Sequence, residues 1–213
     1  MNTAKKMKIF SESQRTHYHD LFGRYLVAIS KSSYARHTGR SASVSTDAND
    51  AKLQGPVFAE EMSIILLWGS VGSIILKSHF NLKFAKRKAG QNLQIPEAKV
   101  DERTALDFMG EFMNLQGGAV RSAFGGTEFS MGMSLPFLAL GSDEAIFRKI
   151  RDPRSQFQTW RCHEGNSDDE LICTSEIYIH DFVVMESMSR KVEAETKKLT
   201  SSNYGDSNNV EFF

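Results

Sequence analysis

The 213-residue sequence has few cysteines, no net charge and no long apolar run. Its two cysteines, Cys162 and Cys173, are too few for the disulfide framework of small secreted folds. Lys and Arg together number 26, as do Asp and Glu, so overall charge gives no reason to expect nucleic acid or a membrane as partner. The most apolar stretch, residues 62–76, is too short to span a bilayer. We therefore expect a cytoplasmic protein with reduced thiols.

Apolar spacing predicts three helices in the first two thirds of the chain. Residues 11–36 carry apolar side chains at helical intervals, and either Ser11 or Ser13 is placed to cap the start. Residues 82–89 predict a short basic helix that ends at Gly90. A long helix is expected over residues 99–124. A polar helical segment is expected again over residues 190–198.

The remaining apolar segments predict strands. They lie at residues 41–46, 57–68, 73–77, 128–140, 156–163 and 171–180. Pro136 predicts an edge, a bulge or a break in the fourth of these. Because tight turns join consecutive strands, the expected fold class is α+β, with long helices packed on a largely antiparallel sheet.

The hairpin of residues 57–77 is nearly continuous in Ile and Leu, so the sheet that it enters should be buried on both faces or against long helices. Such a hairpin could also extend a sheet across two subunits, which makes a homodimer the expected assembly. Cys162 and Cys173 fall on neighbouring strands, where a disulfide is geometrically possible and free thiols are the expectation in a cytosolic protein. Their spacing from His163 and His180 matches no zinc pattern, so no metal site is predicted.

The long helix of residues 99–124 carries one narrow polar strip. At 100° per residue, Asp107, Glu111, Asn114 and Gly118 fall within about 60° of arc. Nearly all other side chains from residue 106 to 124 are apolar or small. The helix is therefore expected to be embedded on most sides and to present one slot of polar groups.

Three glycines interrupt the same helix, each at a cost of about 1 kcal/mol relative to alanine. Gly110 and Gly117 fall on the apolar side, where they are expected to let another element pack closely. Gly118 falls on the polar strip, where a missing side chain leaves room for the backbone of a partner.

The pattern Asp-x3-Glu-x2-Asn on a helix, followed by a proline some twenty residues on, resembles the CheC/CheX/FliY family of chemotaxis phosphatases. Its residues here are Asp107, Glu111, Asn114 and Pro136, with Pro136 one residue earlier than the family pattern. Glu111 and Asn114 form the one Glu-x-x-Asn of the chain, so a single site resembles CheX more than the two-site CheC. The resemblance implies a CheC-like or CheX-like fold. It divides the chain into an N-terminal extension (1–10), a CheX-like phosphatase domain (11–185) and a polar C-terminal tail that is expected to be in part helical (186–213).

The resemblance implies a hydrolase that removes the aspartyl phosphate of a CheY-like receiver domain in chemotaxis or related two-component signalling. Asn114 would orient the attacking water, because an amide both donates and accepts hydrogen bonds without charge. Glu111 would pair with the active-site lysine of the receiver, and Asp107 and Gly118 would support the site. No cofactor is expected in this chain, since Mg²⁺ would come with the phosphorylated partner.

Two other hypotheses are also compatible with the sequence. The same fold could serve as a non-catalytic, dimeric adaptor for response regulators. A fold-only relative with an unrelated ligand is the third possibility, and it requires that the strip from Asp107 to Gly118 be buried or blocked by the tail.

Overall fold

An antiparallel sheet with helices on both faces forms the body of the computed structural model, which describes residues 8–38, 59–124, 131–163 and 170–201. The strands in these ranges are β1 (Glu61–Gly69), β2 (Gly72–Phe80), β3 (Met131–Met133), β4 (Phe137–Leu140), β5 (Gln156–His163) and β6 (Glu170–Ile179). The helices are α1 (Glu12–Thr38), α2 (Leu82–Leu93), α3 (Glu102–Phe124), α4 (Glu144–Lys149) and α5 (Phe182–Ser201). The predicted strand at residues 41–46 lies outside the described ranges.

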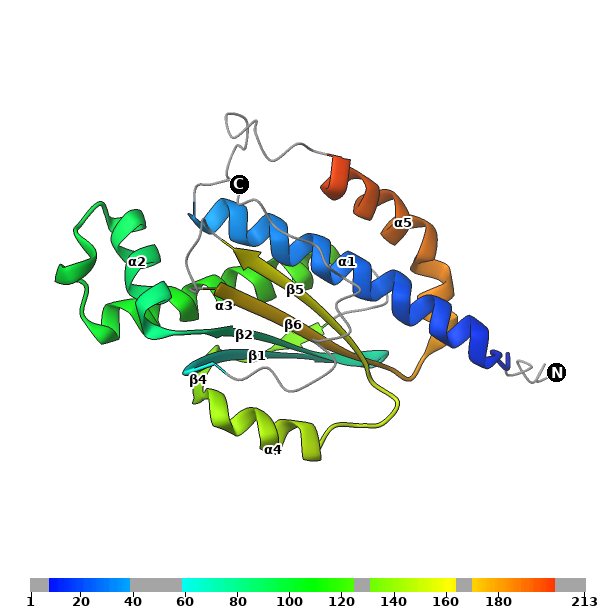
Figure 1. Ribbon diagram of the computed structural model, residues 1–213. Helices are drawn as coiled ribbons and strands as arrows, with labels where there is room; N and C mark the ends of the chain where they lie inside the picture. The colour runs from blue at the N-terminus through cyan, green and yellow to red at the C-terminus, as the bar shows by residue number, and fades with distance from the viewer. Residues whose placement is uncertain (1–7, 39–58, 125–130, 164–169, 202–213) are drawn as a thin grey trace.

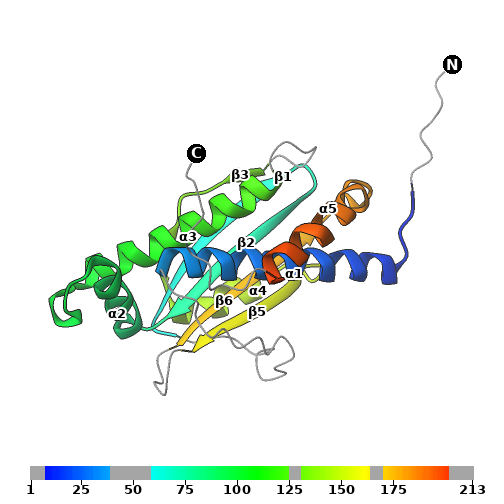
Figure 2. The same cartoon turned by 90° about the horizontal axis from the view of Figure 1, so that it is seen from above.

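The strand order is β3-β1-β2-β6-β5, and β4 also pairs with β1. All of these pairings are antiparallel. Helices α1 and α3 lie side by side on one face of the sheet, and α4 lies on the opposite face (Figure 1, Figure 2). The α+β architecture predicted from the sequence is confirmed.

The predicted route to a dimer is wrong, because β1 and β2 lie in the interior of the sheet. β1 pairs with β2 on one side and with β3 and β4 on the other, while β2 pairs with β1 and β6. A strand with neighbours on both sides has no free hydrogen-bonding edge with which to extend a sheet into a second subunit. The Ile- and Leu-rich composition of this hairpin reflects burial on both faces instead.

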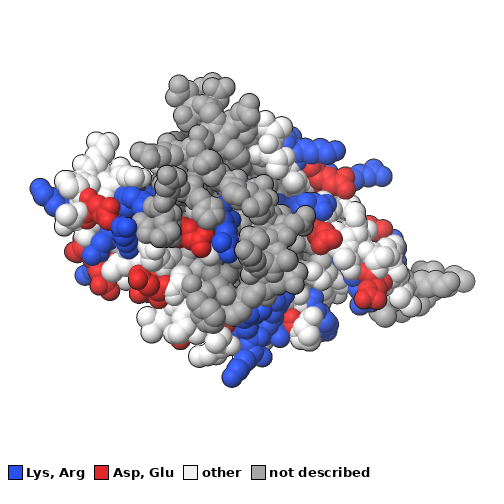
Figure 3. Space-filling view, viewed as in Figure 1, with Lys and Arg blue, Asp and Glu red and all other residues white. Residues whose placement is uncertain are grey.

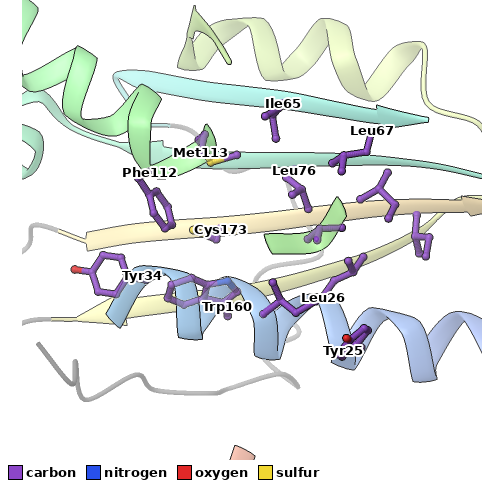
Figure 4. Close-up of a cluster of buried hydrophobic side chains, with 14 of the residues drawn as sticks. Tyr25, Leu26, Tyr34, Ile65, Leu67, Leu76, Phe112, Met113, Trp160 and Cys173 are labelled. Atoms are coloured by element: carbon purple, nitrogen blue, oxygen red, sulfur yellow. The ribbon is translucent and has the colours of Figure 1, made fainter. Parts of the chain in front are cut away.

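The core lies between the sheet and the two long helices. In Figure 4, Leu26 and Tyr34 of α1 and Phe112 and Met113 of α3 point toward the sheet residues Ile65, Leu67, Leu76, Trp160 and Cys173. All of these side chains are at least 96% buried. The apolar stripes that predicted the helices are therefore the faces that bury against the sheet.

Helix α1 begins with the cap that the sequence offered at Ser11. The backbone N–H of Gln14 donates to Ser11 Oγ at 3.2 Å, and the backbone N–H of Ser11 donates to Gln14 Oε1 at 2.9 Å. This reciprocal pair satisfies two backbone donors at the helix start, as in a capping box.

Helix α2 does not end at Gly90, as the sequence suggested, but continues to Leu93. Gln94 takes the left-handed conformation (φ 57°) that closes the helix. Gly90 is needed for close packing instead, because a Cβ there would lie 2.9 Å from the carbonyl oxygen of Ile95. The glycine is required by the neighbouring backbone and not by a helix stop.

Pro136 breaks the predicted strand of residues 128–140 into β3 and β4. Ile64 pairs with Phe137 and Leu67 pairs with Met133, so two residues of β1 (65 and 66) face three residues (134–136) on the partner segment. This extra residue makes a local bulge next to a proline that cannot donate a ladder hydrogen bond. Ser134 holds the segment in place, since its backbone N–H donates to the carbonyl of Leu66 at 2.9 Å and its Oγ accepts from the Leu66 N–H at 3.0 Å.

A buried ion pair attaches α4 to the far face of the sheet. Lys77 Nζ lies 2.7 Å from Glu144 Oε2, and both side chains are nearly inaccessible to water. The two opposite charges compensate each other. Either charge alone at this buried position would carry a large desolvation cost.

Helix α5 starts at Phe182, earlier than the sequence indicated, and runs through the position where a polar tail was expected to begin. Its buried residues are Met185, Met188 and Val192. Phe10, in the expected N-terminal extension, is also buried, and its ring lies 5.9 Å from that of Phe182.

Charges of both signs are intermixed over the face shown in Figure 3. No helix among the described residues is long and apolar enough to cross a membrane. Cys162 and Cys173 lie on the paired strands β5 and β6, as predicted, and both thiols are buried and not joined in a disulfide. Burial raises the pKa of the Cys173 thiol well above its ordinary value.

Gly117→Ala should destabilise the protein, whereas Gly118→Ala should stabilise it. A Cβ at Gly117 would lie 2.7 Å from Ile65 Cδ1 and 2.9 Å from Met133 Sδ, but a Cβ at Gly118 would meet nothing within 4 Å. We expect a net loss of about 1 kcal/mol or more for the first variant and a gain of up to about 1 kcal/mol for the second. Chemical denaturation measures both, and equal effects would contradict this account of α3.

Stability should fall as the pH drops from about 6.5 toward 4. Burial, assisted by the charge of Lys77, lowers the pKa of His79 to about 3. Between that value and the unfolded pKa of about 6.5, the unfolded chain binds a proton that the folded protein does not, so acid favours unfolding. Burial lowers the pKa values of His19 and His37 as well, with the same sign.

The slope contributed by His79 should approach 1.4 kcal/mol per pH unit. His79→Gln should flatten the dependence of unfolding free energy on pH, and His17→Gln, on the exposed surface of α1, should leave it unchanged. Denaturation curves at pH 7, 6, 5 and 4 test this, and an unchanged slope in the first variant would refute the assignment.

Candidate functional site

Helix α3 is capped by Asp101, whose Oδ1 accepts a hydrogen bond from the backbone N–H of Thr104 at 2.8 Å. A short 3-10 turn, Glu97–Lys99, precedes the cap, so the helix begins a little later than the sequence indicated. The buried residues of α3 recur at helical spacing and include Ala105, Met109, Phe112, Met113 and Val120. The predicted polar strip consequently faces away from the core.

The rotation of α3 is fixed by a buried hydrogen-bond centre on α1. Ser30 Oγ accepts from Gln116 Nε2 at 2.7 Å and from Trp160 Nε1 at 2.8 Å. Gln116 is only 1% exposed, and it lies two residues beyond Asn114, about 200° around the helix. With Gln116 held inward, Asn114 is directed outward.

A pocket of about 210 Å³ lies between α3 and the segment that links β3 to β4. Its described lining residues are Ser63, Leu106, Asp107, Gly110, Glu111, Asn114, Leu135, Pro136 and Leu138. Four positions that the sequence singled out, Asp107, Glu111, Asn114 and Pro136, therefore meet at one place, although Pro136 is far from the others along the chain. Glu111 is exposed and Asn114 is half-buried.

The two proposed catalytic side chains lie next to each other at this pocket. Asn114 Nδ2 is 3.5 Å from Glu111 Oε2, at the outer limit of a hydrogen bond. The amide therefore remains available to another group. Asp107 lies 3.8 Å from Arg103 in an exposed i,i+4 pair, which contributes little to stability.

The glycines of α3 only partly match the sequence interpretation. Gly117 permits close packing against Ile65 and Met133, as expected. Gly110 was expected on the packed side and is instead at the pocket, where a Cβ would meet nothing within 4 Å. Gly118 has open space above it, as predicted for the strip, but it is not among the described lining residues of the pocket.

Ser63 is a lining residue that the sequence interpretation missed. It lies in β1 within the apolar run Met62-Ser63-Ile64-Ile65, and its side chain is fully buried. One small polar residue in an otherwise apolar strand is the signal that could have marked it.

His37 holds the end of α1 against α3, one turn before Glu111. Its ring stacks on Phe108 with 4.2 Å between centroids, and Nε2 lies 3.3 Å from the Phe108 carbonyl oxygen. Burial lowers the pKa of His37, and the negative charge of Glu111 partly opposes this shift. The imidazole therefore supports the helix beside the site mainly by packing.

The described residues contain no group of three His, Cys, Asp or Glu side chains placed to hold a metal ion. The described part of α5 does not line the pocket, and Glu111 is exposed. The strip is therefore not covered by any described residue. Blocking of the strip by tail residues 202–213, which the fold-only hypothesis also allows, lies outside the described residues.

Neither a protein-family model nor a curated protein sequence matches the chain. Several solved structures, however, are similar to it. The chemotaxis protein CheX from Vibrio vulnificus is similar with a TM-score of 0.55 and 12% identity, over 75% of this chain and 99% of that one. A CheC-like superfamily protein from a Shewanella species is similar with a TM-score of 0.52 and 11% identity, over 75% and 97%.

A CheX from Borrelia burgdorferi, determined in a complex with CheY, BeF3 and Mg²⁺, is similar with a TM-score of 0.52 and 17% identity, over 75% of this chain and 98% of that one. These similarities cover nearly the full length of the known proteins. The chain therefore has the fold of CheX and CheC-like proteins, as its sequence pattern indicated.

Ser30→Ala should destabilise the protein, because it leaves Gln116 Nε2 and Trp160 Nε1 without their acceptor. Each buried donor left unsatisfied costs about 1–3 kcal/mol. Ser32→Ala, which removes a half-buried hydroxyl that accepts from the exposed Arg36 on the same helix, should cost less than about 0.5 kcal/mol. Denaturation of the two variants measures the difference, and similar effects would argue against a special role for Ser30.

Proposed function

We propose that the protein hydrolyses the aspartyl phosphate of a CheY-like response regulator, in chemotaxis or a related two-component pathway. The observation that carries the proposal is the meeting of Asp107, Glu111, Asn114 and Pro136 around one open pocket. The CheX-like fold supports it, as does the existence of a CheX structure in complex with CheY.

The reaction needs little covalent chemistry from the protein. Water attacks the phosphorus, the bond from phosphorus to the aspartyl oxygen breaks, and aspartate and inorganic phosphate are released, with the surplus proton passing to phosphate or solvent. An acyl phosphate is already activated, so orienting the water and stabilising charge are sufficient. Mg²⁺ arrives as part of the phosphorylated partner.

Asn114 orients the water in this proposal. Its amide carries no charge, donates and accepts hydrogen bonds, and is held beside the pocket by the inward anchor at Gln116. Its contact to Glu111 is long, so the amide is free to turn toward a docked phosphoryl group.

Glu111 fixes the position of the partner in the same proposal. A carboxylate is repelled by a phosphoryl group, so Glu111 acts productively only with a cation between them. The active-site lysine of the receiver is the proposed cation, in a charge-assisted hydrogen bond. Asp107, one turn earlier, adds negative charge, and Gly118 leaves room for the partner.

This function would place the protein in the cytoplasm. The homodimer expected from the sequence stays a proposal, and no interface is assigned to it. A non-catalytic adaptor on the same fold is the alternative. It shares the docking surface and differs only in the absence of turnover.

Asn114→Ala should abolish accelerated phosphate release from a phosphorylated CheY-like receiver while leaving binding intact. Removing one preorganised group of this kind typically costs about 100-fold in rate. Glu111→Gln should instead raise the dissociation constant, because the charge partner of the lysine is lost. Ser122→Ala, exposed on the same helix, serves as the control for both.

The measurement is phosphate release with Mg²⁺, together with binding by calorimetry. Wild-type protein that binds phosphorylated receivers without accelerating their decay would establish the adaptor. Wild-type turnover that persists in Asn114→Ala would remove Asn114 from the mechanism.

A further inference from the structure

The Ser63 hydroxyl is a buried polar group without a partner at the floor of the pocket. The residue is 0% exposed, and its Oγ has no hydrogen-bond partner among the residues that the structure describes. A buried hydroxyl in this state is unfavourable and therefore unusual in a folded protein. Its position as a lining residue suggests that the missing partner is a ligand.

The register of the sheet directs Ser63 toward α3. Ser63 lies opposite Leu138 of β4, and paired residues of neighbouring strands point to the same face. Leu138 lines the same pocket. Two residues along β1, Ile65 occupies the space beneath Gly117 of α3.

Gly110 precedes Gly117 by seven residues, which is two helical turns, so the two glycines lie on the same side of α3. At Gly117 the space beneath the helix is filled by Ile65, whereas a Cβ at Gly110 would meet nothing within 4 Å. The pocket is therefore open here because the facing residues of β1 and α3, Ser63 and Gly110, are both small.

Charge and shape limit what can enter. The ionisable groups among the described lining residues are Asp107 and Glu111, both acids, so a phosphoryl oxygen would be repelled. Leu135, Pro136 and Leu138 offer apolar contact along one wall. An ammonium group on an aliphatic chain fits both properties, since its charge pairs with the acids and its methylene groups pack against the apolar wall.

We infer that Ser63 is a further binding residue of this site, whose hydroxyl accepts a hydrogen bond from an ammonium group on an aliphatic side chain of the docking protein. An ammonium has three donors, so Glu111 and Ser63 can each accept one. Naming the docking protein as a receiver domain rests on the proposed function. Ser63 acts on docking and not on the phosphoryl group, so its effect belongs in KM and the dissociation constant, not in kcat.

Ser78 provides a matched control. It lies directly opposite Ser63 on β2, it is also 0% exposed, and its Oγ likewise has no partner among the described residues. Ser78 is not among the described residues that line the pocket. Replacing either serine by alanine removes an unsatisfied hydroxyl, so neither variant should lower the unfolding midpoint.

The first experiment is independent of any receiver. Wild-type protein is titrated with n-butylammonium chloride, and in parallel with inorganic phosphate, while backbone amide resonances are followed by NMR. Ser63 and Gly110 should shift with butylammonium and not with phosphate, in wild type and in Ser78→Ala but not in Ser63→Ala. No shift at these amides in wild type, or equal shifts in all three proteins, overturns the inference.

The second experiment uses a phosphorylated receiver. Ser63→Ala should raise KM about tenfold, the size expected for a lost hydrogen bond to a charged group, with kcat unchanged and with Ser78→Ala equal to wild type. A receiver whose active-site lysine is replaced by methionine should bind Ser63→Ala and wild type equally. A fall in kcat, or parallel losses in both serine variants, overturns the role.

The two proposals fail separately. Butylammonium shifts that depend on Ser63, in a protein that releases no phosphate from any receiver, would sustain the binding residue and refute the phosphatase. Normal phosphate release with no effect of Ser63→Ala in either experiment would support the phosphatase and refute Ser63 as a binding residue.

Discussion

The hydrogen bonds to Ser30 set the geometry on which the site depends. One hydroxyl on α1 accepts from Gln116 on α3 and from Trp160 on β5, so it joins two helices and the sheet at one buried point. A helix packed only by apolar contacts can rotate slightly as its side chains repack, whereas two buried donors that share one acceptor permit little rotation. Because Gln116 and Asn114 point in opposite directions, the anchor that satisfies the first also exposes the second.

Residue size along α3 then decides where the helix touches the sheet and where it stands clear of it. At Gly117 the absence of a side chain brings the helix down onto Ile65, and at Gly110 the same absence leaves space. The difference lies in the strand beneath, which presents isoleucine at one place and serine at the other. Close packing at Gly117 therefore holds the helix at the height at which the pocket beside Gly110 stays open.

The sequence predicted the polar strip because a single helix has a fixed period, and three of its members, Asp107, Glu111 and Asn114, do line the pocket. It could not reveal Ser63, whose relation to that strip depends on the pairing of β1 with β4 and on the height of α3. Nor could it assign Gly110 to the pocket, since a helix in isolation does not show which glycine meets a bulky neighbour. The family pattern supplied Pro136, which periodicity alone would not have linked to the helix.

Local signals misled the sequence interpretation where tertiary contacts decided the outcome. Gly90 predicts a helix end, but the carbonyl of Ile95 approaches it and the helix closes later at Gln94. Helix α5 was expected to start late, yet Asp181 caps it by accepting from the backbone N–H groups of Val183 at 3.0 Å and Val184 at 3.2 Å. The apolar residues that follow Asp181 read equally well as the end of a strand.

The floor and the rim of the pocket belong to strands with different numbers of neighbours. Ser63 lies on β1, which is hydrogen-bonded on both sides. Pro136 and Leu138 lie on the segment at the edge of the sheet, which among the described strands pairs with β1 alone. Separating the edge segment from β1 breaks one row of backbone hydrogen bonds. Displacing β1 would break two rows and would also disrupt the packing of α3 on the sheet. Amide exchange should accordingly be slow beneath the site and faster along its border. A docking protein would then contact an edge segment, with Pro136 and Leu138, that can adjust its conformation, whereas β1 beneath the pocket stays fixed.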